Sequence, residues 1–102
     1  KPIPSGRSLM LTLDSRVQPA PGVVVRESGD ELVVVAPAQG KYLVLNRTGA
    51  AVFRHMNGET PLRDIAGALS QDFQAPVDRV QADVLHLAAQ LLERGMIVLT
   101  EG

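Results

Sequence analysis

Residues 31–53, ELVVVAPAQGKYLVLNRTGAAVF, contain the point at which the apolar pattern changes from strand-like to helical. Segments 31–36 and 41–45 are rich in aliphatic and β-branched residues, and the Pro- and Gly-containing residues 37–40 separate them as a turn. After Asn46 the apolar residues recur with a helical period, and Asn46 or Thr48 can cap the helix. We therefore predict two neighbouring strands that lead at once into a helix ending near Met56.

A further strand is predicted upstream, at residues 22–27, because β-branched residues dominate there and a Ser-Gly-Asp turn follows. The short connections favour an antiparallel meander of these three strands. Segment 31–36 is apolar at successive positions, as expected for a strand that is central in its sheet or covered on both faces. Residues 9–13 alternate and are expected to be a short strand or an ordered tail, and Pro19, Pro21 and Gly22 are expected to break any regular element.

Downstream, two more helices are predicted. Thr60-Pro61 opens the first, as a cap followed by proline in the first turn. Ala75-Pro76 opens the second, which runs to about Arg94 and stops at Gly95. Residues 96–99 form a short apolar tail or strand. Strands segregated from helices predict an α+β fold with a three-stranded antiparallel sheet followed by three helices.

Composition narrows the function classes. The chain has 102 residues, which is one domain by length, and we divide it into a tail or short extra strand at 1–16 and a domain at 17–102. There is no Cys, which excludes disulfides and thiolate chemistry. The net charge of -1 opposes nucleic-acid binding. No apolar run approaches a membrane span, and we expect a cytoplasmic protein.

The third predicted helix is more apolar than one contact surface needs. Its core stripe is Val77, Val80, Val84, Leu87, Ala88 and Leu91. A second edge, Ala82, Leu85 and Ala89, either packs on the other two helices or walls a groove. The last strand of a three-stranded meander is also an edge, where an extended peptide can add as a further strand.

Several motifs then occur in a fixed order. They are GKYLVLNRTGAAVF at 40–53, NGET at 57–60, DIA at 64–66 with Leu69, V-x-x-D-V at 80–84, and L-x-x-x-G-M-I at 91–97. From about residue 17 to 99 this series resembles the PqqD-like family of RiPP recognition elements. These domains hold the leader of a precursor peptide that is made by the ribosome and then modified.

The resemblance implies a winged helix-turn-helix-like fold without catalytic residues or a cofactor. It implies that the leader adds to strand 41–45, in the cleft between that strand and helix 76–94, and is delivered to an enzyme. That enzyme is a radical SAM enzyme, a leader peptidase or a cyclodehydratase. The Pro-Glu pair of quinone-cofactor members is absent and Gly49 stands where Ala is common, so a lasso-peptide or another modified-peptide pathway stays open.

Eleven residues form the predicted peptide-binding site, from the strand and from the third helix. They are Lys41, Tyr42, Leu43, Val44, Leu45, Asp78, Gln81, Ala82, Asp83, Leu85 and Ala89. Asp83 matches the family's Asp-Val pair and is a candidate contact for a basic leader residue. His55 and His86 are expected to be solvated helix residues, because a metal site needs more ligands.

Two alternatives stay open. The first is a winged-helix DNA-binding regulator, which the acidic residues Asp78, Asp83 and Glu93 of the third helix oppose. The second is a structural partner domain, such as a homodimer formed through the exposed strand edge or through residues 9–13.

Overall fold

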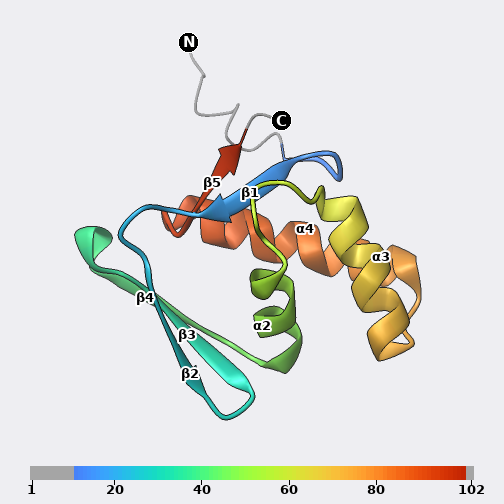
Figure 1. Ribbon diagram of the computed structural model, residues 1–102, viewed down its shortest axis with the longest axis horizontal. Helices are drawn as coiled ribbons and strands as arrows, with labels where there is room; N and C mark the ends of the chain where they lie inside the picture. The colour runs from blue at the N-terminus through green and yellow to red at the C-terminus, as the bar shows by residue number, and fades with distance from the viewer. Residues whose placement is uncertain (1–10, 101–102) are drawn as a thin grey trace.

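The computed structural model describes residues 11–100 (Figure 1). The elements follow in the order β1 (Arg16–Pro19), β2 (Val24–Ser28), β3 (Glu31–Ala36), the 3-10 helix η1 (Pro37–Gln39), β4 (Lys41–Leu45), α2 (Arg47–Arg54), α3 (Leu62–Phe73), α4 (Val77–Glu93) and β5 (Ile97–Thr100). The predicted α+β class, with three antiparallel strands followed by three helices, is confirmed.

The main sheet has the strand order β2-β3-β4, with both pairs antiparallel. β3 is its central strand, which accounts for the uninterrupted apolar run of the sequence. Leu32, Val34 and Ala36 of β3 are buried, whereas Val33 and Val35 on the other face are half-buried. One face of the sheet therefore covers the core, and the other lies closer to solvent.

A second sheet of two strands pairs β1 with β5, from Arg16 opposite Thr100 to Pro19 opposite Ile97. The predicted short tail or strand at 96–99 is a strand, β5, and the break predicted at Pro19, Pro21 and Gly22 separates β1 from β2. Pro19 is the last residue of β1, where a missing N–H does little harm. Residues 11–13 are not in a strand, and residues 9–10 lie outside the described part. β1 begins one residue before the predicted domain boundary.

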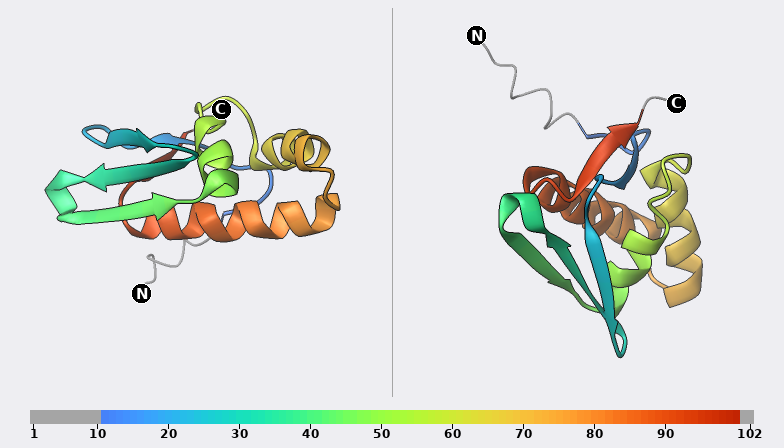
Figure 2. Two further views of the ribbon diagram at one scale, coloured as in Figure 1. Left: turned by 90° about the horizontal axis from the view of Figure 1, so that it is seen from below. Right: turned by 60° about the vertical axis from the view of Figure 1, so that its left-hand side comes forward.

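The core lies where the inner sheet face meets α2, α3 and α4. Within α4, four residues of the predicted core stripe are buried: Val80, Val84, Ala88 and Leu91. Val77 at the start of the helix is 41% exposed, and Leu87 is only half-buried. Figure 2 shows α4 running along the molecule, with α3 beside its first half and β4 and α2 nearer its second half.

Gly95 ends α4 as predicted, with a φ of 73° that a residue with a side chain rarely adopts. A Cβ built at this position would lie 3.1 Å from the Gln39 side-chain nitrogen. The end of α4 and the turn that leads into β4 are therefore in contact. No helix among residues 11–100 combines the length and the apolar character needed to cross a bilayer.

Replacing Gly67 by Ala should stabilise the fold. Gly67 lies within α3 and is half-buried, yet a Cβ there would meet no atom within 4 Å, so close helix packing does not require glycine. The lower backbone entropy of Ala should raise the free energy of unfolding by about 1 kcal/mol in urea titrations. Gly58→Ala is the contrasting control. Gly58 has a φ of 81°, which alanine adopts only with strain, so this variant should have a lower free energy of unfolding. A destabilised Gly67→Ala would contradict the packing described.

Replacing Asn46 by Ala should destabilise α2. The Asn46 side-chain oxygen accepts a hydrogen bond from the Gly49 amide at 2.9 Å, so of the two predicted candidates, Asn46 and Thr48, Asn46 is the N-cap. Its loss should lower the free energy of unfolding by about 1 kcal/mol. Asn46→Asp keeps the acceptor and is the matched control in the same denaturation experiment. Equal losses in both variants would mean that the cap bond does not stabilise the helix.

Candidate peptide-binding site

β4 is an edge strand. It pairs with β3 on one side, and within residues 11–100 no strand pairs with its other side. Leu45 is buried and Leu43 half-buried, so they anchor the strand on the core. Tyr42 and Val44 point to the opposite face and are 68% and 48% exposed. Contacts with the core fix the position of β4. The backbone N–H and C=O groups along its outer edge have no partner strand within residues 11–100.

A pocket of about 330 Å³ opens where β4 ends. Its first wall comes from the passage into α2 and its second wall from α4. The lining residues are Asn46, Thr48, Gly49 and Val52 on the first wall, and Asp83, His86 and Leu87 on the second. The pocket forms because Asn46 ends the strand and caps the helix without an intervening loop, which brings the first turn of α2 opposite the middle of α4.

The two walls combine apolar surface with a single acid. Val52 is buried and Leu87 half-buried, so the pocket has an apolar floor. Asp83 and His86 are exposed at its rim. In the part of the chain that the structure describes, the Asp83 carboxylate takes part in no hydrogen bond or ion pair within 4.0 Å. The pocket can therefore hold a side chain with an apolar stem and a donor or cationic end.

The predicted site residues fall into two groups. The β4 residues form one continuous strand, and Asp83 lies in the pocket at its end. Gln81 and Leu85 are half-buried, and Asp78, Ala82 and Ala89 are exposed; none of these five lines that pocket.

The predicted site includes one residue that lines the pocket, Asp83, and omits the other six. On α4 these are Leu87, which its helical spacing assigned to the core, and His86, which is exposed as predicted but also lines the pocket. On the first wall they are Asn46, Thr48, Gly49 and Val52. The sequence partly indicated that Leu87 lies near Asp83, because the two residues are one helical turn apart and share a face of α4.

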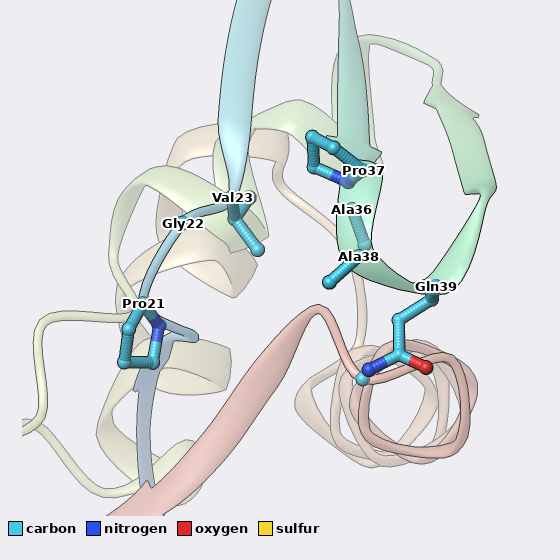
Figure 3. A pocket seen from close by; sticks show the side chains of 8 residues that line it. Pro21, Gly22, Val23, Ala36, Pro37, Ala38 and Gln39 are labelled. Carbon is cyan, nitrogen blue, oxygen red and sulfur yellow. The ribbon is translucent and has the colours of Figure 1, made fainter.

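A second hollow, of about 260 Å³, lies beside η1. Figure 3 shows it between the residues that enter β2, the end of β3 and the last turn of α4. Its lining residues are Pro21, Gly22, Val23, Ala36, Pro37, Ala38, Gln39 and Gly95. Only Gln39 has a polar side chain, so this hollow offers packing surface and one amide, without an acid or a base.

The histidines do not form a metal site with other ligands. His55 is half-buried at the end of α2, and its Nδ1 lies 2.8 Å from the Ala51 carbonyl oxygen, so it is less solvated than predicted. His86 is exposed at the pocket. Among residues 11–100, no group of three or more His, Asp or Glu side chains is placed to hold a metal ion.

The chain matches a family model described as coenzyme PQQ synthesis protein D (PqqD) over residues 31–97. No curated protein matches it. The matched segment extends from the start of β3 to the first residue of β5 and includes both the edge strand and the pocket.

Three solved structures share the fold. The PqqD truncation of Methylobacterium extorquens PqqCD, a stand-alone RiPP recognition element, has a TM-score of 0.76 at 21% identity and covers 90% of this chain and 98% of that one. Lasso peptide synthetase B1 complexed with the leader peptide has a TM-score of 0.73 at 22% identity, with 81% and 98% covered. TbiB1 in complex with the TbiA(beta) leader peptide has a TM-score of 0.71 at 18% identity, with 78% and 93% covered.

The family match and the shared fold confirm the resemblance found in the sequence, including the absence of an enzymatic role. The chain belongs to the PqqD family of RiPP recognition elements, which are non-catalytic domains that bind the leader segments of precursor peptides.

Proposed function

We propose that this chain binds an extended segment of a precursor-peptide leader as an additional strand on the outer edge of β4. The observation that carries the proposal is the unpaired edge of β4, next to the pocket formed with α4. A strand added there runs past the pocket, and its side chains alternate between the α4 side and solvent.

Backbone pairing supplies affinity with little regard to sequence. Every second residue of a strand directs its N–H and C=O to the outer edge, so two or three residues of β4 can each exchange a pair of hydrogen bonds with the leader. Each bond contributes about 1 kcal/mol net. The preformed edge lowers the ordering cost for the protein, because Leu43 and Leu45 already fix the strand on the core.

Specificity comes from side chains beside this edge. The pocket that Val52, Asp83 and Leu87 help to line accepts one leader side chain, and Tyr42 lies on the other face of β4. Two of the similar structures, TbiB1 and the lasso peptide synthetase B1, were solved with leader peptides, which supports a leader as the ligand here. The predicted α4 contacts at Asp78, Gln81, Ala82, Leu85 and Ala89 remain candidates that the same titration tests.

The domain presents the leader to an enzyme that carries out the chemistry. A radical SAM enzyme or a leader peptidase is the proposed partner class, in a lasso-peptide, quinone-cofactor or similar pathway. The DNA-binding alternative has weaker support, because α4 carries Asp78, Asp83 and Glu93 and the β2–β3 hairpin carries Asp30 in its turn and Glu31 at the start of β3. Acidic side chains on both elements repel phosphates.

The test is a backbone N-methylation series on a synthetic leader, taken from the precursor gene nearest to the gene for this chain. Methylating an amide that faces β4 removes one hydrogen bond and blocks close approach, so binding should fall about tenfold or more. Methylating the next amide, which faces away, should have little effect. We expect affinity to fall at every second position over a run of about five residues, measured by fluorescence anisotropy.

Amide NMR on the labelled protein, titrated with the unmethylated leader, locates the contact. Shifts in residues 41–45 and in α4 are expected. A methylation profile without the period of two, or shifts elsewhere, would contradict strand addition. Binding to duplex DNA that weakens steeply with salt, without leader binding, would favour the regulator. Light scattering on the same samples measures the molecular mass, which shows whether a second copy of the chain, and not the leader, occupies the edge of β4.

A further inference from the structure

One stripe along α4, which ends at the C-cap residue Arg94, carries opposite charges at its two ends. Asp83, Leu87, Gln90 and Arg94 follow one another at spacings of four, three and four residues, which places them on one side of the helix. Asp83 and Leu87 line the pocket at the end of β4. Arg94 precedes Gly95, which touches the Gln39 side chain in the turn before β4. The stripe therefore extends from the end of β4 toward its beginning.

The acidic end of the stripe is open to a ligand. Asp83 is exposed at the pocket and, within residues 11–100, takes part in no ion pair. Arg79 lies one helical turn before it, but no ion pair within 4.0 Å joins the two, and Arg79 does not line the pocket. The negative charge of Asp83 is thus available to a cation that enters the pocket from β4.

The basic end has an unmet hydrogen-bonding requirement. Arg94 is half-buried, and its Nη1 is shielded from solvent without a hydrogen-bond partner in the described part of the chain. The ion pairs found there use other arginines, Arg54 with Glu27 and Arg63 with Asp14. A buried donor on a charged group is costly to leave unpaired. Because protein atoms cover Nη1, an acceptor on a ligand would relieve that cost only after the half-buried Arg94 side chain turned outward.

We propose that this stripe selects leaders with two opposite charges: a basic side chain at the Asp83 end and an acidic side chain at the Arg94 end. The inference rests on the proposed strand addition to β4. Asp83 and Arg94 are separated by about 16 Å along the helix axis. Two leader residues can both face α4 only at an even separation, and four or six residues of extended chain span about 13 or 20 Å.

The order of the two charges follows from strand direction. The pairs β2–β3 and β3–β4 are antiparallel, and an antiparallel leader would continue this pattern. Its first residues would then lie at the end of β4, beside Asp83, and its later residues near Arg94. The expected motif is a Lys or Arg followed four or six residues later by an Asp or Glu.

The experiment is selection of a displayed library of random 15-residue peptides on the purified chain. Binders that perturb the amides of residues 41–45 should be enriched in this ordered charge pair. The doubly reversed variant Asp83→Lys, Arg94→Glu should enrich the opposite order, acidic before basic. Glu93→Gln, an exposed change on another side of α4, is the matched control and should keep the original order.

Selected peptides are then tested on the unaltered chain, which avoids any effect of a variant on folding. Exchanging the acidic peptide residue for its amide should weaken binding about tenfold, since the bond to Arg94 is charge-assisted. Exchanging the basic residue for Met should weaken binding about threefold, because Asp83 is exposed. On the Arg94→Gln variant, exchanging the acidic peptide residue for its amide should no longer weaken binding.

The outcomes separate this inference from the proposed function. Peptides that bind along β4 without the charge pair, or in which the exchanges change affinity less than twofold, would overturn the charge selection and leave strand addition in place. A library from which no peptide binds along β4 would contradict strand addition itself, and the charge selection with it.

Discussion

The hydrogen bond from the Gly49 amide to the Asn46 side chain fixes the geometry on which the rest of the site depends. It allows a strand to become a helix without a loop, so α2 begins directly at the end of β4. The first turn of α2 then stands opposite α4, and the space between them becomes the pocket. A longer connection would let α2 pack elsewhere and would leave the edge of β4 without a wall at its end.

Short-range sequence patterns predicted most of the fold, because most helices and strands pack against elements that are close to them in the sequence. The strands 31–36 and 41–45, the cap at Asn46 and the stop at Gly95 each follow from a few adjacent residues. The pairing of β1 with β5 joins the two ends of the described chain. No local pattern encodes that contact. Only the packing of the ends against the core determines it.

The site was predictable where it depends on topology and less so where it depends on helix faces. That β4 is an edge follows from the order of strands along the chain, so its residues could be named from sequence. The wall on α4 is harder, because the helix is apolar over a wide arc and several partners compete for it. Leu87 has the spacing of a core residue, yet it is half-buried and lines the pocket with Asp83.

An open strand edge is normally a liability, because it pairs with any extended chain. Here the edge is flanked by features that restrict what can pair with it: a pocket with one acid at one end and, on the inferred stripe, an arginine with an unpaired donor at the other. Backbone pairing is nearly the same for every peptide, so it cannot distinguish one leader from another. Charged side chains beside the edge can distinguish leaders, because a leader with the wrong charges binds more weakly. Such a leader leaves Arg94 unpaired or places a second acid against Asp83. If leaders add to β4 as proposed, changes in a few residues along α4 would alter which leader binds while the edge of β4 stays the same.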